Sequence, residues 1–188
     1  MKALKLTIIV ALVATLFALS PVGFSYPEGN ADNFVGVGKC KMCHKHQYEK
    51  WLDMKHSGAF AVLETEAADK LGVEKGMLAE GEKASESPKC LKCHVTGYDV
   101  ETQTIAKKIE KKKAKYPLGV QCESCHGAGK EYAKKPVMKD REKSLAAGLV
   151  LPTEEVCVQC HNEESPSYEP FDFEERYAKI AHKTPEKK

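Results

Sequence analysis

The sequence predicts a mainly α-helical fold with much coil, and three observations point to it. Segments with helical spacing of apolar residues are short, strand patterns are few, and glycine-, proline- and lysine-rich stretches separate them. All eight cysteines fall into four copies of one five-residue pattern. The aliphatic content is modest, so side chains alone would form a small core in this 188-residue chain. We therefore expect bound cofactors to complete the core.

The first 25 residues have the pattern of a secretory signal peptide. Two lysines precede an apolar run over residues 6–19, and small residues precede a predicted cleavage site before Tyr26. The run is shorter than the ~20 residues that a membrane-spanning helix needs. We expect residues 26–188 to form a single exported domain in the periplasm, with no membrane span after cleavage. An uncleaved anchor and an extracellular location are the alternatives.

The charge of the predicted mature chain is balanced. Removing the two leader lysines from 29 basic residues leaves 27, equal to the 27 acidic residues. Proteins whose main partner is nucleic acid are strongly basic, so this balance argues against that class of partner. The sequence leaves the oligomeric state open.

The cysteine pattern is C-x-x-C-H, the attachment sequence of c-type haem. Two thiols reach the vinyl groups on one edge of a porphyrin, and the histidine that follows binds the iron. The four copies are Cys40–His44, Cys90–His94, Cys122–His126 and Cys157–His161. The thiols expected to hold four haems are Cys40, Cys43, Cys90, Cys93, Cys122, Cys125, Cys157 and Cys160. The predicted fold is thus a compact multihaem cytochrome wrapped around four covalently attached haems.

Other uses of these cysteines fit the pattern less well. Disulfides suit an exported chain with an even cysteine count, but they do not require a histidine after every second cysteine. Four separate zinc sites would each lack an obvious fourth ligand. A thioredoxin-like redox pair needs one motif in a βαβ setting rather than four.

Seven histidines must serve four irons. The four motif histidines, predicted iron ligands, are His44, His94, His126 and His161. The three that remain as candidates for the opposite axial position are His56, His182 and His46, in that order of preference. Three methionines are further candidates: Met54, Met77 and Met138. Since three imidazoles cannot complete four irons, at least one haem is expected to be five-coordinate, methionine-ligated or completed by another chain.

Local patterns predict the helices between the motifs. One helix is predicted over residues 44–63, weakened at Ser57-Gly58, because four residues recur at helical spacing: Leu52, His56, Phe60 and Leu63. A short helix and a loop are expected over residues 64–88. Weak alternation over residues 98–105 indicates a hairpin arm. Residues 107–115 are strongly basic; a solvated face is the simpler interpretation, and a docking patch for an acidic partner is the alternative.

Two further helices follow. One is predicted around residues 142–147, and Pro152-Thr153 begins another that leads into the fourth motif. In the tail, Asp172 and Glu175 have the spacing of a capped helix start, and the helix is expected to run to His182. On such a helix His182 lies far around the axis from Ile180, so periodicity does not turn it inward.

The residues that flank the motifs carry a further signal. They are Gly38 to His44 with Tyr48, Trp51 and Lys55-His56-Ser57-Gly58-Ala59, then Gly119 to Gly127, Cys157 to Asn162, and Phe171-Asp172-Phe173 with Lys179-Ile180-Ala181-His182. Together these segments resemble the cytochrome c-554 family of tetrahaem proteins. The resemblance covers nearly all of the mature chain. The C-x-x-C-H motifs are shared by many cytochromes, so these flanking residues carry the specificity.

The resemblance implies a mainly helical fold that holds closely packed haem pairs. It also implies distal histidines on most haems, with His56 and His182 at matching positions, and one five-coordinate haem in the best-known member. That member accepts electrons from hydroxylamine oxidoreductase, a role that does not transfer with the family. This sequence departs from the family in having no histidine between His94 and His126.

Three functions follow from these residues. The first is a periplasmic electron carrier that passes electrons from haem to haem between redox protein partners. The second is an enzyme that reduces a small nitrogen or sulfur compound at a five-coordinate haem, although no dedicated set of catalytic residues is visible. The third is a subunit of a larger multihaem complex or filament, with ligands donated between chains.

Overall fold

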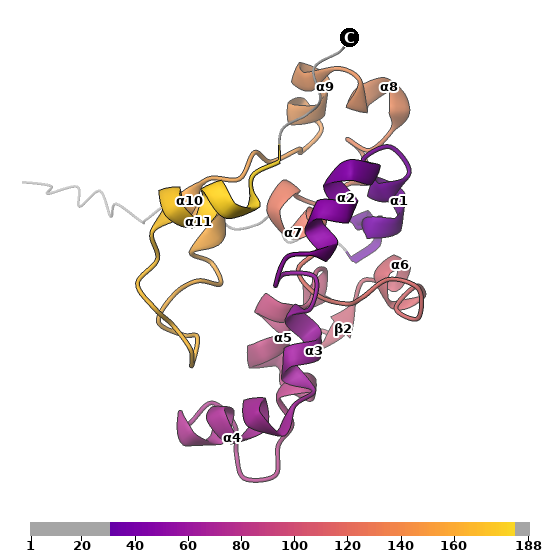
Figure 1. The fold of residues 1–188 in the computed structure, drawn as a ribbon. Coiled ribbons are helices and arrows are strands. Elements are labelled where there is room, and N and C mark those ends of the chain that lie inside the picture. Colours follow the sequence, from indigo (N-terminus) through magenta and orange to yellow (C-terminus); the bar gives the residue numbers. More distant parts are fainter. Residues whose placement is uncertain (1–30, 183–188) are drawn as a thin grey trace, which may run out of the picture.

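The computed structural model describes residues 31–182, and the predicted signal peptide lies outside them (Figure 1). The described residues form short helices joined by turns and coil, with one β-hairpin whose strands have two residues each. The predicted mainly α class is therefore confirmed. The elements are η1 (Ala31–Asn33), α1 (Val37–Lys41), α2 (Lys45–Leu52), α3 (Ala59–Leu63), α4 (Glu66–Glu74), η2 (Ala84–Glu86), α5 (Pro88–His94), β1 (Tyr98–Asp99), β2 (Thr104–Ile105), α6 (Lys107–Glu110), α7 (Cys122–His126), α8 (Lys135–Met138), α9 (Arg141–Ala146), α10 (Glu154–Cys157) and α11 (Phe173–Ile180). Within residues 31–182 no helix has the length and apolar content needed to cross a bilayer.

The helix predicted over residues 44–63 is wrong as a continuous element. Instead α2 ends at Leu52 and α3 begins at Ala59, with turns between them. The hydroxyl of the buried Ser57 donates to the carbonyl oxygens of Leu52 and Met54, both at 2.9 Å, and these bonds help to end α2. The carbonyl oxygen of His56 accepts a hydrogen bond from the Val120 N–H at 3.0 Å. A distant segment therefore fixes the break, which the local pattern could not reveal.

Most other predicted elements are confirmed. The helix and loop over residues 64–88 are α4 and η2. Residues 98–105, predicted as one arm of a hairpin, form both of its strands, with β1 antiparallel to β2. In α11, the Asp172 carboxylate accepts from the Glu175 N–H at 2.9 Å, as the capping pattern predicts. This helix ends at Ile180 rather than at His182, because Ala181 is extended. The direction of His182 is thus set by extended backbone and not by helical periodicity.

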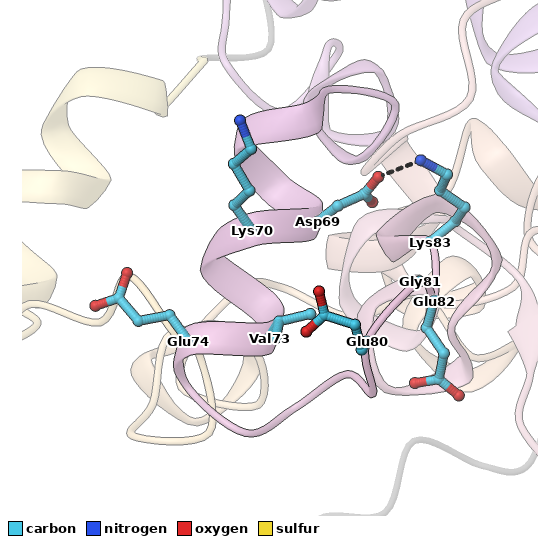
Figure 2. Close-up of a pocket in the computed structure, with 8 residues that line it drawn as sticks. All are labelled: Asp69, Lys70, Val73, Glu74, Glu80, Gly81, Glu82 and Lys83. Carbon is cyan, nitrogen blue, oxygen red and sulfur yellow. Dashed lines mark hydrogen bonds and ion pairs between the residues drawn. The ribbon is translucent and has the colours of Figure 1, made fainter.

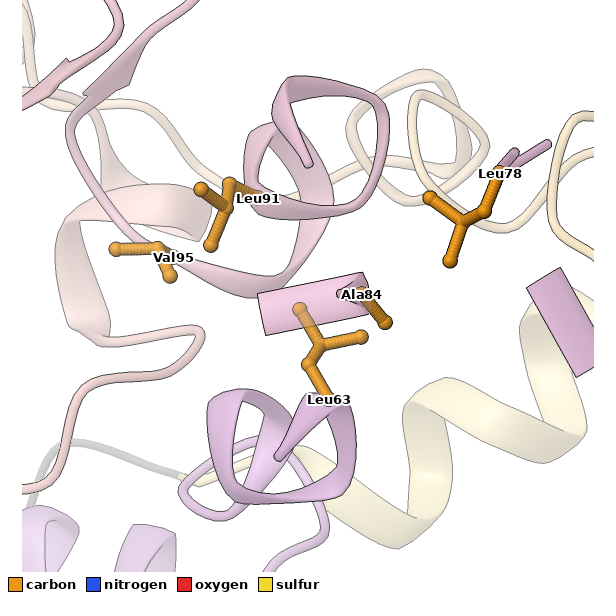
Figure 3. Close-up of a cluster of buried hydrophobic side chains, with 5 residues drawn as sticks. All are labelled: Leu63, Leu78, Ala84, Leu91 and Val95. Atoms are coloured by element: carbon orange, nitrogen blue, oxygen red, sulfur yellow. The ribbon is translucent and has the colours of Figure 1, made fainter. Parts of the chain in front are cut away.

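A small apolar cluster joins α3, α4, η2 and α5 in the lower part of Figure 1, and Figure 3 shows its members converging. The cluster consists of Leu63, Leu78, Ala84, Leu91 and Val95. A second cluster, beside α1 and α2, consists of Val37, Tyr48 and Trp51, and the Trp51 indole N–H donates to the Val120 carbonyl oxygen at 2.8 Å. Neither is large enough to be the core of a conventional domain of this size.

One buried carboxylate fastens the N-terminal segment to the third motif. Glu123, in α7, has no exposed surface, and its two oxygens accept the backbone N–H groups of Val35, Gly36 and Gly129 at 2.7–2.9 Å. Burial raises the pKa of this carboxyl, and the three N–H donors oppose that shift. These bonds position α1, and with it the first motif, against α7.

Candidate haem sites

Each C-x-x-C-H motif lies on one helical turn. The second motif lies within α5 and the third is α7 itself, while the first spans the end of α1 and the fourth the end of α10. The N–H of His44 donates to the Cys40 carbonyl oxygen at 2.9 Å, and that of His161 donates to Cys157 at 3.0 Å. Residues three and four positions apart share a face of a helix. The turn thus presents both thiols and the imidazole on one side.

The fourth-motif histidine faces a second imidazole. The ring centres of His161 and His56 lie 6.0 Å apart with planes at 74°. The His161 ring also stacks on Phe171, with centroids 5.0 Å apart and planes at 23°. The turn between α2 and α3 therefore brings His56 to the fourth motif, more than a hundred residues away in sequence.

The third-motif histidine has a partner of the same kind. The ring centres of His126 and His182 also lie 6.0 Å apart, with planes at 70°. The ammonium group of Lys50, in α2, donates to the carbonyl oxygen of Ala181 at 2.5 Å. This bond ties the end of α11 to α2, so His182 is held beside α7 despite its exposure.

Both spacings fit a haem iron between two axial imidazoles. With each nitrogen about 2 Å from the metal, the two ring centres are separated by about 6 Å. The donor set therefore fits c-type haem at the third and fourth motifs.

Backbone carbonyls orient three of these imidazoles. His94 Nδ1 lies 2.7 Å from the Ala59 carbonyl oxygen, and His126 Nδ1 lies 2.9 Å from that of Val150. His182 Nδ1 lies 3.3 Å from the Ile180 carbonyl oxygen. A carbonyl only accepts, so Nδ1 carries the hydrogen in each pair and Nε2 keeps its lone pair free for a metal.

The protonation states suit metal ligation as well. Burial lowers the pKa of His56, and the neighbouring His161 lowers it further. Burial lowers the pKa of His126, and burial together with Arg176 lowers that of His161. An imidazole must be neutral to bind iron, so each shift favours the ligating form at neutral pH.

Thiol contacts show how the four motifs are arranged. The thiols of Cys40 and Cys122 form a hydrogen bond that, with burial, raises the pKa of Cys40. Those of Cys93 and Cys160 form another, which likewise raises the pKa of Cys160. Burial raises the pKa of Cys125 to about 11, with Cys157 adding to the shift. The motifs therefore neighbour one another in the order first, third, fourth, second.

The remaining predicted ligands are not brought into such pairs. Among residues 31–182, the ring contacts between histidines involve neither His44 nor His94, and His46 is exposed on α2. Met54, Met77 and Met138 are half-buried, and their ligation stays a prediction. Sequence reasoning missed the residues that position the ligands, among them Phe171 and Lys50. No local signal marks either, because each acts through a distant segment.

One pocket lies away from the four motifs and has no haem-binding residues in its lining. It has a volume of about 360 Å³ between α4 and the loop before η2 (Figure 2). Its lining is charged and contains no cysteine or histidine: Asp69, Lys70, Val73, Glu74, Glu80, Gly81, Glu82 and Lys83. Across residues 31–182, no three histidine, cysteine or acidic side chains gather as a site for a bare metal ion.

Comparisons with known proteins agree with this site. Residues 39–127, which include the first three motifs, match the family described as cytochrome c554 and c-prime. Cytochrome c-554 of Nitrosomonas europaea is 32% identical over 139 residues, a match that covers 68% of this chain and 57% of that protein. The chain thus spans little more than half the length of this curated relative.

The fold is similar as well. The reduced-state structure of cytochrome c554 from Nitrosomonas europaea matches with a TM-score of 0.50 and 28% identity, over 80% of this chain and 78% of that one. The family carries covalently bound c-type haems, and the four motifs match its count of four. The motifs, the matched family and the shared fold together show that this chain belongs to the cytochrome c-554 family.

Proposed function

We propose that this protein is a periplasmic electron carrier that passes single electrons between redox protein partners. A bound c-type haem supplies a one-electron Fe(III)/Fe(II) couple. Membership of the cytochrome c-554 family supports the assignment, and the leader-like residues 1–25 support a location outside the cytoplasm.

The residues that would hold each haem follow from the motifs and the paired rings. The two cysteines of each motif would form the thioether bonds, and the motif histidine would bind the iron. His56 would be the second iron ligand with His161 at the fourth motif, and His182 would be the second ligand with His126 at the third. The Ala59 and Val150 carbonyl oxygens hold His94 and His126 in the tautomer that ligates through Nε2.

The order of the motifs is the observation that carries the proposal. Cys40 interacts with Cys122 and Cys93 with Cys160, while the charge of Cys157 contributes to the raised pKa of Cys125; these neighbours support haems in the order first, third, fourth, second. A series of this kind lets an electron hop between neighbouring haems. Because no substrate bond breaks, the residues need only fix ligands, exclude water and keep imidazoles neutral.

A redox titration of the holoprotein, followed by visible absorption, tests the carrier role. We expect four reversible one-electron steps and full reoxidation by an outer-sphere oxidant. A haem that cannot be reduced and reoxidised reversibly would contradict the proposal.

The unpaired first and second motifs favour a second candidate, a reductase that acts on a small nitrogen or sulfur compound. Within the described residues neither His44 nor His94 faces another imidazole, so an axial position of each haem would be open where no methionine or other chain fills it. Carbon monoxide titration of the reduced protein should then give two molecules bound per chain. Four low-spin haems that bind no gas would exclude this enzyme.

A further inference from the structure

Six exposed lysines form a basic face on and after α6. They are Lys107, Lys108, Lys111, Lys112, Lys113 and Lys115. The acidic residue among them is Glu110, which pairs with Lys113 at 2.5 Å. The buried Ile109, 3% exposed, anchors the segment to the protein. Six lysines against one glutamate make this face strongly positive, although the whole chain has a formal net charge of only +2.

The basic face lies directly against the helix of the first motif. A Cβ added at Gly36 would lie 3.5 Å from the Ile109 side chain. One added at Gly38 would lie 2.5 Å from the Tyr116 ring, so α1 touches the segment that ends the basic face. The Lys41 ammonium, within the first motif, lies 6.0 Å from the centre of the same ring.

The first motif is also the most exposed of the four. Of the eight motif cysteines Cys43 is the exposed one, and the others are partly covered. Met42, which lies between the two cysteines, is 66% exposed. In the order of thiol contacts this motif stands at one end of the series. Its haem would therefore be both terminal and near the surface.

We propose that electrons enter or leave the protein through the first haem, which we call the electron port. In this proposal the basic face binds an acidic redox protein next to that haem. This inference rests on the proposed carrier function, and it specifies the partner only as a protein with an acidic surface. Carboxylates of the partner would lie against the lysines, and one electron would pass between the partner's one-electron centre and the iron of the first haem. Complementary charge speeds encounter more than it adds affinity, which suits a carrier that must also dissociate.

A second lysine-rich segment offers a matched control. Lys134, Lys135 and Lys139 are exposed on and around α8. Acids in this segment are paired locally, Glu131 with Lys134 at 2.5 Å and Asp140 with Lys143 at 3.0 Å. Replacing three lysines in either segment changes the net charge by the same amount. A difference between the two variants therefore reflects the position of the charges and not the net charge.

The experiment follows oxidation of the fully reduced holoprotein by stopped flow. It compares Lys108→Gln/Lys111→Gln/Lys112→Gln with Lys134→Gln/Lys135→Gln/Lys139→Gln. The oxidants are hexacyanoferrate(III), an anion, and tris(phenanthroline)cobalt(III), a cation. At low ionic strength, where charges act over ~30 Å, we expect the first variant to react about fivefold more slowly with the anion and faster with the cation. The control should change less than about twofold, and all differences should vanish at ~1 M salt, where screening is complete within ~3 Å.

A binding measurement extends the test to a protein-like partner. In calorimetry at low salt, a glutamate decamer should bind the wild type and the α8 variant but not the basic-face variant. Equal behaviour of the two variants with the oxidants, or equal binding of the decamer, would overturn the port. Failure of the carrier function would give a different result from failure of the docking proposal, because neither oxidant would then reoxidise the haems.

Discussion

The regions around the second motif and around the third and fourth motifs are held together differently. Around the second motif, α3, η2 and α5 enclose an apolar cluster, and its histidine faces no second imidazole among the described residues (Figure 3). Around the third and fourth motifs there are two histidine pairs, and the cluster of Val37, Tyr48 and Trp51 reaches only Cys122, at the start of the third motif. One region is thus stabilised by side chains packed against each other, and the other depends on the cofactors.

The largest expected effect is on spin state in the region of paired histidines. His56→Ala should convert one low-spin haem to high spin and add one carbon monoxide site per chain, because the iron opposite His161 loses its second ligand. Absorption and electron paramagnetic resonance spectra measure both changes. His46→Ala, which alters an exposed residue, is the control. An unchanged spectrum of His56→Ala would remove it from the ligands.

In the side-chain-packed region the effect should be on stability instead. Leu63→Ala, at a site 5% exposed, should lower the free energy of unfolding by about 2–5 kcal/mol while the haem spectrum stays unchanged. Val62→Ala, at the neighbouring residue that is 56% exposed, should change it by less than about 0.5 kcal/mol. Denaturant titrations followed by circular dichroism compare the two. A change in the haem spectrum of Leu63→Ala would contradict the proposed difference between the two regions.

A substitution at Gly119 should change both the stability and the haem spin state. Its φ is +140°, and an added Cβ would lie 2.7 Å from the Ser57 carbonyl oxygen. Gly119→Ala should therefore cost about 1–3 kcal/mol and displace His56, so that part of one haem becomes high-spin. Gly58→Ala in the same turn is the control, because its Cβ would lie 3.9 Å from the Lys55 carbonyl oxygen. Equal stability of the two variants would contradict this role for Gly119.

Replacing the buried carboxylate of Glu123 should lower the stability of the protein. In Glu123→Gln one oxygen becomes an NH₂ group and cannot accept the backbone N–H groups that now reach both oxygens. We expect a loss of about 1–3 kcal/mol in thermal or denaturant unfolding. Glu131→Gln, which removes an exposed ion pair with Lys134, should change stability by less than about 1 kcal/mol. A neutral effect of Glu123→Gln would show that the N-terminal segment is held by other contacts.

The smallest expected effect concerns Lys50. Lys50→Met removes the hydrogen bond to the Ala181 carbonyl oxygen, so His182 should leave the iron of the third motif for part of the time. The measurement is the high-spin fraction, which should rise partially and reverse in Lys50→Arg. Lys45→Met, at an exposed ion pair with Glu49, should leave it unchanged. No rise in Lys50→Met would mean that α11 holds His182 without this bond.

The local patterns predicted much of the fold. The Asp172 cap, the helix around residues 142–147 and the helix that leads into the fourth motif depend on neighbouring residues, and all are present. The helix predicted through Ser57 failed because bonds from Val120 and the close approach of Gly119 come from a segment about sixty residues away. The end of α11 before His182 likewise escaped prediction, since an extended Ala181 leaves no mark in apolar periodicity.

The sequence by itself determined the cofactor chemistry of this protein. Thiol–thiol–imidazole attachment needs five consecutive residues, and seven histidines set an upper limit on the iron ligands. Tertiary structure decided which imidazole meets which: His56 with His161, His182 with His126, and none of the described ones with His44 or His94. An axial ligand on the far side of a haem can come from any segment that folding brings there, so its position along the chain carries no local signal. The basic residues next to the first motif were visible in the sequence, but only their contact with α1 places them beside an exposed attachment site.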